Sequence, residues 1–274
     1  MSDDAGKLRL VVPGAAGKMG RMIVKVIADS PTAQLVAAVE RPGSPLIGQD
    51  AGVVAGLTAL SVKIQSELDD ALAQADVIID FTAPAATAWT VSRAAEHGVA
   101  VVIGTTGLGE AEKRAVWQAA ERIPIVLSAN MSLGVNVLFG LIAQAAKALG
   151  NDYDVEIVEL HHRQKRDAPS GTALAMASAL AEALGRDLGV VTRNGRAGNV
   201  GARTTDEIGI HAVRGGDIVG EHTAYFCGLG ERLEVTHRAS SRETFAHGAV
   251  RAAEWLRDRD PGLYDMQDVL GLRR

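Results

Sequence analysis

Short apolar runs alternate with helix-like stretches through the first half of this chain. The runs cover residues 8–12, 34–39, 76–82, 99–103 and 124–127, and helix-like patterns lie between them, for example at 85–96 and 110–121. This alternation predicts βαβ units, whose strands pair in parallel to form an open sheet. Ligands bind such sheets at the carboxyl ends of the strands, so the loops after the runs are the first candidate sites.

The first of these loops is rich in glycine. Gly14, Gly17 and Gly20 follow the run at 8–12 and lead into an apolar-periodic stretch that reaches Ile27. A glycine turn between strand and helix is typical of dinucleotide-binding proteins, because it permits close approach of the pyrophosphate. Such turns also occur without a ligand, so the spacing alone leaves both interpretations open.

Glu40 ends the next strand-like run. An acidic residue about 20 positions past the glycines binds the adenosine ribose hydroxyls in dinucleotide-binding proteins. Arg41 follows it and could instead face a 2′-phosphate. We therefore expect NADH to be used and NADPH to be tolerated; the alternative is a polar turn without a ligand.

Three more loops follow strand-like runs, at residues 81–84, 104–107 and 128–131. The second reads Gly-Thr-Thr-Gly, and its hydroxyls and backbone donors suit the ribose or the amide of a nicotinamide. An ordinary strand-to-helix turn is the alternative for this loop.

The second half of the chain follows a different pattern. A helix is predicted at 135–149, ended by Gly150, then a strand at 155–160 and a long helix at 172–184. The glycine-rich polar stretch at 193–205 predicts a mobile loop.

Three strand-like runs come next, at residues 208–213, 218–226 and 232–237, and glycine turns join them. This arrangement predicts an antiparallel meander and hence an α+β second domain. A broad sheet with few covering helices leaves one face exposed, which favours oligomerisation. A capping-box pattern at 240–243 predicts a final helix.

The segment at 161–172 carries the most chemistry. His161, His162 and Lys165 follow the strand at 155–160, and Ser170-Gly171-Thr172 opens the next predicted helix. Unpaired N–H groups at a helix start attract anions, histidine exchanges protons near neutral pH, and lysine supplies positive charge. The segment predicts a site for a small anionic substrate that must be protonated. A solvated basic loop is the alternative.

Composition argues against several other classes. The formal net charge of −5 argues against a nucleic-acid binder, and the single cysteine excludes an internal disulfide. The remaining histidines match no metal-binding spacing, so we expect no metal. The start of the chain is acidic and polar, and apolar runs such as 99–103 are too short to span a bilayer. We therefore expect a cytoplasmic protein.

The motifs together resemble one family. The chain is similar over nearly its whole length to bacterial dihydrodipicolinate reductases, also called 4-hydroxy-tetrahydrodipicolinate reductases, of the diaminopimelate–lysine pathway. The likeness rests on the glycine turn, on Ile103-Gly-Thr-Thr-Gly107, on the stretch that starts at Ala129-Asn130-Met131, on Glu159-x-His-His-x-x-Lys165 with Ser170-Gly-Thr172, and on the stretch from Arg214 to His222. Gln164 is a departure, since some members carry a basic residue there.

The resemblance implies an α/β fold with two domains. Residues 1–132 and 240–274 would form a Rossmann-like, parallel-sheet nucleotide domain. Residues 133–239 would form a substrate-binding and tetramerisation domain with a mostly antiparallel open sheet. The implied reaction is the NADH- or NADPH-dependent reduction of a cyclic dicarboxylate imine by a homotetramer.

It also implies roles for individual residues. His161 would donate a proton, Lys165 would be a second donor or stabilise charge, and His162 would contact substrate. Ser170, Gly171 and Thr172 form the predicted carboxylate site. The predicted cofactor site, which includes the loop residues Arg41 and Phe81, comprises Gly14, Ala15, Ala16, Gly17, Lys18, Met19, Glu40, Arg41, Phe81, Gly104, Thr105, Thr106, Ser128, Ala129, Asn130 and Met131.

Two other functions remain open from the sequence. One is an oxidoreductase with the same nucleotide domain that acts on aspartate semialdehyde or homoserine. The other is a non-catalytic sensor that only binds NAD(P), although a sensor would not need an acid beside an anion site.

Overall fold

The structure is a computed structural model that describes residues 6–272. The expectation drawn from the start of the chain rests mainly on residues 1–5, which lie outside the described residues. The described chain divides into two compact units. The first contains the described residues up to Ser132 and from Glu243 onward, and the second is Leu133–Arg242.

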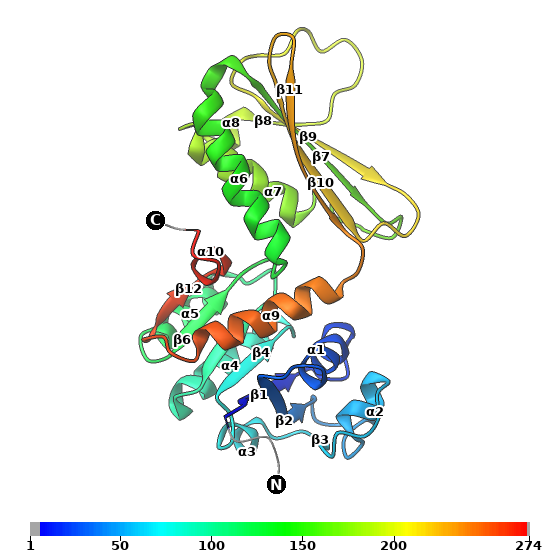
Figure 1. Ribbon diagram of the computed structural model, residues 1–274, viewed down its shortest axis with the longest axis vertical. Coiled ribbons are helices and arrows are strands. Elements are labelled where there is room, and N and C mark those ends of the chain that lie inside the picture. The colour runs from blue at the N-terminus through cyan, green and yellow to red at the C-terminus, as the bar shows by residue number, and fades with distance from the viewer. Residues whose placement is uncertain (1–5, 273–274) are drawn as a thin grey trace. The chain divides into compact units, whose positions relative to one another are not determined.

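A seven-stranded parallel sheet forms the centre of the first unit (Figure 1). Its strands are β1 (Leu8–Pro13), β2 (Ala33–Val39), β3 (Ile64–Gln65), β4 (Val77–Asp80), β5 (Ala100–Ile103), β6 (Pro124–Leu127) and β12 (Gly262–Tyr264). The order is β12-β6-β5-β4-β1-β2-β3, which confirms the predicted Rossmann-like fold. Because β1 pairs with both β2 and β4, the strand order reverses there, which is where such sheets bind ligands.

Helices cover this sheet. They are α1 (Lys18–Ala28), α2 (Ala51–Ala55), α3 (Leu68–Leu72), α4 (Pro84–His97), α5 (Glu110–Ala120), α9 (Glu243–Leu256) and α10 (Met266–Val269). Apolar side chains of α3, α4 and α5 form one core with the strands, and α1 and α9 pack together and against the sheet. A parallel strand is covered on both faces, so its consecutive residues are apolar. Val101, Val102 and Ile103 of β5 are accordingly all buried.

The second unit contains a five-stranded mixed sheet (Figure 1). Its elements are α6 (Leu133–Leu149), the short 3-10 helix η1 (Gly150–Asp152), β7 (Asp154–His161), α7 (Gly171–Ala183), α8 (Leu188–Val191), β8 (Thr192–Asn194), β9 (Ile208–Arg214), β10 (Gly220–Cys227) and β11 (Arg232–Ala239). The order is β11-β10-β7-β9-β8. β10 is antiparallel to β7 and β11, whereas β9 is parallel to β7 and β8.

The predicted meander is correct for β10 and β11 and wrong for β9 and β10. β7 lies between β9 and β10, so these two strands do not pair despite the glycines between them. The connection from β7 to β9 passes through α7, and a helical crossover returns the chain parallel to the strand it left. The expected final helix, α9, is also followed by β12 and α10.

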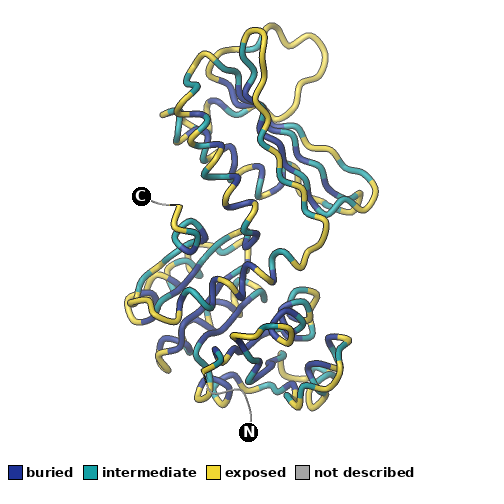
Figure 2. Tube along the Cα trace, in the orientation of Figure 1, coloured by how far each residue is buried: buried dark blue, intermediate teal, exposed yellow. Residues whose placement is uncertain are grey.

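Helices α6 and α7 cover one face of the second sheet. Figure 2 shows the buried segments where these elements meet, and Leu138, Ile142, Ile157 and Phe226 belong to this core. Residues Leu133–Asp152, which comprise α6 and η1, are long and apolar enough to cross a membrane, by length and composition only. Core helices of soluble proteins can have the same length and composition, and α6 supplies Leu138 and Ile142 to this core.

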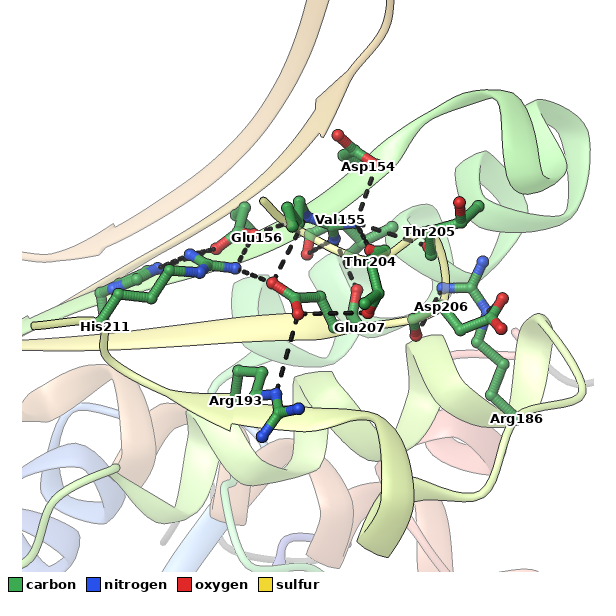
Figure 3. Close-up of polar contacts among 12 residues, drawn as sticks. Asp154, Val155, Glu156, Arg186, Arg193, Thr204, Thr205, Asp206, Glu207 and His211 are labelled. Atoms are coloured by element: carbon green, nitrogen blue, oxygen red, sulfur yellow. Dashed lines mark hydrogen bonds and ion pairs between the residues drawn. The ribbon is translucent and has the colours of Figure 1, made fainter. Parts of the chain in front are cut away.

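The polar stretch at 193–205 is partly structured. Thr192–Asn194 forms β8, so the prediction of a loop was wrong for Arg193 and the residue after it. The rest of the stretch is held at the sheet by Arg196 and Arg203, which both donate hydrogen bonds to Glu156 of β7. Figure 3 shows Glu156 and Glu207 within this set of polar contacts.

Candidate active site

The glycine turn between β1 and α1 is tightly folded. Gly14 has a φ of 66°, in the left-handed region that favours glycine, and the N–H of Gly17 donates to its carbonyl at 2.9 Å. A Cβ on Gly20 would lie 2.1 Å from the same carbonyl oxygen. These glycines therefore bring α1 close to β1, as the binding of a pyrophosphate at the helix start requires.

Glu40 lies beside this turn. Its Oε1 accepts a hydrogen bond from the N–H of Ala16 at 3.0 Å, and its Oε2 accepts from the N–H of Arg41 at 3.3 Å. The side chain thus projects from the end of β2 toward the glycines, and Arg41 is exposed next to it. The geometry suits the predicted role of Glu40 at a ribose.

The loops after β4 and β5 are connected by a hydroxyl network around Asp80. This carboxylate is fully buried, and its Oδ1 accepts from the N–H and Oγ1 of Thr82 at 2.8 and 2.6 Å. Thr105 adds a longer contact at 3.4 Å, and Thr87 donates to Thr105 at 2.9 Å. Oδ2 has no hydrogen-bond partner among the described residues. Burial raises the pKa of Asp80 despite the hydrogen bonds from Thr82.

The other loop residues lie at neighbouring strand ends. Phe81 packs against Gly104, where an added Cβ would lie 2.2 Å from its ring. Ser128 donates to the carbonyl of Asn130 at 2.9 Å, and Met131 is buried. Because β4, β5 and β6 are adjacent and parallel, these three loops and the glycine turn meet at one edge of the sheet. The residues present fit a dinucleotide.

In the second unit, Glu159 organises the segment predicted to be catalytic. The side chain is fully buried, and the two NH groups of Arg214 each donate to one of its oxygens at 2.7 Å. His161 Nδ1 lies 2.6 Å from Oε2, and the N–H of Ser170 donates to Oε1 at 3.0 Å. Burial raises the pKa of Glu159, but these hydrogen bonds outweigh it, so the pKa lies below its usual value and the carboxylate is ionised.

His161 is buried next to a second imidazole. Burial lowers its pKa and outweighs the hydrogen bond with Glu159, which raises it. The ring of His222 lies 5.1 Å away, edge to face. Burial, followed by the neighbouring His161, lowers the pKa of His222 to about 4, so His222 is neutral at pH 7.

The predicted anion site falls at the start of α7. Ser170 is the buried N-cap, and its Oγ accepts from the N–H of Ala173 at 3.1 Å and lies 3.0 Å from His222 Nε2. Gly171 is exposed, with open space where a Cβ would stand. Ser170 is bonded on several sides, and Gly171 is the residue of this turn with open space beside it.

Lys165 and His162 lie on the loop between β7 and α7. Lys165 Nζ forms an ion pair with Asp167 at 2.8 Å, and Arg214 donates to the carbonyl of Asp167 at 2.8 Å. Arg242 donates to His162 Nε2 at 3.3 Å. Arg214 therefore connects Glu159, the carboxylate bonded to His161, to the loop that carries Lys165.

Four residues with clear structural roles were not among the predicted site residues: Asp80, Glu159, Arg214 and His222. Glu159 and Asp80 had a detectable signal, since each is an acidic residue in or at the end of an apolar strand, where a buried charge needs a partner. His222 is one of the histidines that match no metal-binding spacing, and its contact with His161 depends on the pairing of β7 with β10. Among the described residues, no group of three potential ligands could hold a metal ion.

Fold and site together define a Rossmann-type, nucleotide-dependent oxidoreductase. The family model for the N-terminus of dihydrodipicolinate reductase matches residues 8–131, and that for its C-terminus matches residues 134–270. The chain belongs to the dihydrodipicolinate reductase family, which confirms the resemblance.

Individual relatives match over nearly the whole chain. The chain is 53% identical to the 4-hydroxy-tetrahydrodipicolinate reductase of Alkalilimnicola ehrlichii over 96% of this chain and 99% of that relative. It is 56% identical to that of Anaeromyxobacter sp. strain Fw109-5 over 97% and 98% of the two chains. A dipicolinate-bound dihydrodipicolinate reductase from Paenisporosarcina sp. TG-14 shares the fold, with a TM-score of 0.76 and 23% identity over 96% of this chain and 98% of that one.

Proposed function

We propose that this protein reduces 4-hydroxy-tetrahydrodipicolinate, through dihydrodipicolinate, to tetrahydrodipicolinate with loss of water, using NADH or NADPH. Membership of the dihydrodipicolinate reductase family supports the reaction. The observation that supports it most is that the buried Glu159 carboxylate bonds both His161 and the N–H of Ser170 at the start of α7, so a proton donor would lie beside an anion site.

The chemistry requires a hydride, a proton and charge stabilisation. NADH or NADPH, held by the first unit, would supply the hydride that reduces the conjugated ring left after water is lost. His161 supplies the proton that neutralises the electron density developing beside the attacked carbon. Lys165 stabilises that charge or serves as a second donor. The products are tetrahydrodipicolinate, water and the oxidised nucleotide.

The substrate carries two carboxylates, and the second unit offers partners for them. The first turn of α7 presents backbone N–H groups and a positive dipole, and Gly171 leaves room for a close approach. Thr172 and His162 add side-chain contacts, and Ser170 holds the helix start in place. We assign this unit substrate binding and assembly into a homotetramer through the exposed sheet face.

The first unit would hold the nucleotide. The glycine turn would contact the pyrophosphate, Glu40 the ribose of the adenosine, and the loops with Phe81, Gly104 and Asn130 the nicotinamide half. Glu40 repels a 2′-phosphate and Arg41 attracts one, so NADH is preferred and NADPH is accepted. A biosynthetic enzyme of this kind acts in the cytoplasm.

Oxidation of NADH and NADPH at 340 nm tests the proposal, with substrate made in situ by the synthase that condenses pyruvate and aspartate semialdehyde. We expect turnover only when the synthase and both of its substrates are present. Turnover of aspartate semialdehyde or homoserine alone would establish a different oxidoreductase. Tight NADH binding without any turnover would favour a sensor.

A further inference from the structure

We propose that Glu159 is a positioning residue that makes Nε2 of His161 the nitrogen that exchanges protons with the substrate, with Arg214 holding Glu159 in place. This inference rests on the proposed reaction and concerns residues outside its assigned site. It follows from the hydrogen-bond partners of one buried carboxylate.

Glu159 has its bonding capacity filled. Oε2 accepts hydrogen bonds from Nδ1 of His161 and from one NH group of Arg214. Oε1 accepts hydrogen bonds from the other NH group of Arg214 and from the N–H of Ser170. A carboxylate accepts up to about four hydrogen bonds, so it has no capacity for another partner. The two bonds from Arg214 fix the plane of the carboxylate, and the N–H of Ser170 fixes its position at the start of α7.

This arrangement determines the tautomer of His161. An ionised carboxylate only accepts hydrogen bonds, so Nδ1 must carry a proton whether the imidazole is neutral or charged. Nε2 is then the nitrogen that gains or loses a proton. Arg214, Lys165 and His222 surround the ring from β9, the loop and β10, and none of these offers a second carboxylate.

The fold leaves space beside Nε2. Gly220 begins β10 next to His161, and a Cβ built on it would lie 3.1 Å from Nε2 and 3.4 Å from Cδ2 of that ring. A methyl group would therefore press on the nitrogen that has to meet substrate. Glycine at this position avoids that contact, and Glu159 keeps the ring oriented.

The test compares Glu159→Gln with Glu156→Gln, which makes the same change three residues earlier on the opposite face of β7. We expect Glu159→Gln to lower kcat by about 10²-fold. It should also shift the fall of kcat/KM with rising pH to lower pH by about one unit, because the neutral amide no longer stabilises the imidazolium. Glu156→Gln should leave both within threefold of wild type.

Nitrogen-15 NMR of the His161 ring provides a measurement that is independent of activity. In wild type without substrate, we expect the Nδ1-protonated tautomer, and in Glu159→Gln a mixture of tautomers. A wild-type ring with its proton on Nε2 would overturn the proposal, as would a kcat of Glu159→Gln within threefold of wild type. If Glu159→Gln does not fold, Gly220→Ala is measured in its place. The Gly220→Ala variant should keep the Nδ1-protonated tautomer and lower kcat/KM at least tenfold. An unchanged kcat/KM would contradict the role of Nε2.

The same data separate this inference from the reaction on which it rests. Absence of turnover by wild-type protein in the coupled assay, with the expected tautomer, would refute the proposed function alone. Normal turnover with the wrong tautomer would refute only the positioning role of Glu159.

Discussion

Glu156 and Glu159 lie three residues apart on β7 and project to opposite faces of the same sheet. Each binds arginine and histidine side chains. Glu159 binds Arg214 and His161. Glu156 binds Arg196, Arg203 and His211, and Figure 3 labels Glu156 and His211. The same chemistry thus occurs twice on one strand, once at the candidate active site and once at a loop.

The two networks differ in burial and in redundancy. The Glu159 side chain is fully buried and has one arginine, while that of Glu156 is 18% exposed and has two. Burial raises the pKa of Glu156, but the hydrogen bonds from Arg196, His211 and Arg203 outweigh it and lower the pKa to about 2. We therefore expect the Glu156 network to tolerate the loss of one arginine and the Glu159 network not to tolerate it.

The largest expected difference in stability is between variants that each lose one arginine, one from the Glu159 network and one from the Glu156 network. Arg214→Met leaves the Glu159 carboxylate buried without its cationic partner and should lower the free energy of unfolding by about 3–5 kcal/mol. Arg196→Met leaves Glu156 bound to Arg203 and His211 and should cost about 1 kcal/mol or less. Urea unfolding at pH 7 measures both, and equal losses would show that the two networks are energetically alike.

The two histidines should differ in catalysis. His161→Ala should lower kcat by roughly 10²–10³-fold, because this group acts in the transition state. His211→Ala removes the corresponding ring from Glu156 and should change kcat by less than threefold. The coupled assay measures both variants, and a loss below threefold for His161→Ala would remove that residue from the mechanism.

Acid should destabilise the surroundings of the two carboxylates in different pH ranges, through His222 beside His161 in one case and through Glu156 itself in the other. The folded pKa of His222 is about 4, below its ordinary value of 6.5, so the unfolded chain binds more protons between these values. Stability from this group is present above pH 6.5 and is lost as pH falls toward 4, by roughly 3 kcal/mol. Glu156, with its usual value of 4.5 lowered to about 2, loses its contribution only between those values.

Substitutions of His222 and Glu156 test these two pH ranges. His222→Gln should flatten the pH dependence of unfolding between pH 6.5 and 4, and Glu156→Gln should flatten it only below about pH 4.5. The free energy of urea unfolding, measured across this range, gives both slopes. A His222→Gln slope that matches wild type would show that this imidazole is not buried in its neutral form.

Much of this fold was predictable from local patterns, and the pairing of distant segments was not. β6 matches the predicted run at 124–127, and α5 starts at the predicted Glu110, because strand and helix periods are properties of short windows. The position of β7 between β9 and β10 depends on a crossover through α7, which no local turn signal reveals.

The candidate site shows the same limit. Residues 161–172 were recognised from their own chemistry, and the glycine turn from its spacing. Arg214 lies 55 residues from Glu159, and only the parallel register of β7 and β9 brings them together. An acidic residue within an apolar strand indicates from the sequence that a partner is needed, and the strand pairing determines which residue that partner is.

The smallest expected difference concerns the loop at residues 195–207. Trypsin cleaves after arginine only when the side chain is free to enter the protease, and both Arg196 and Arg203 are bound to Glu156 and contact Glu207. Glu156→Gln should speed cleavage after these two arginines about tenfold, which corresponds to about 1.4 kcal/mol of local opening, because Glu207 still binds Arg196. Glu159→Gln carries the same charge change on the opposite face and should be cut at these positions at the wild-type rate. Equal acceleration in both variants, read by mass spectrometry of the fragments, would show that the two carboxylates stabilise one cooperative structure and not two separate regions.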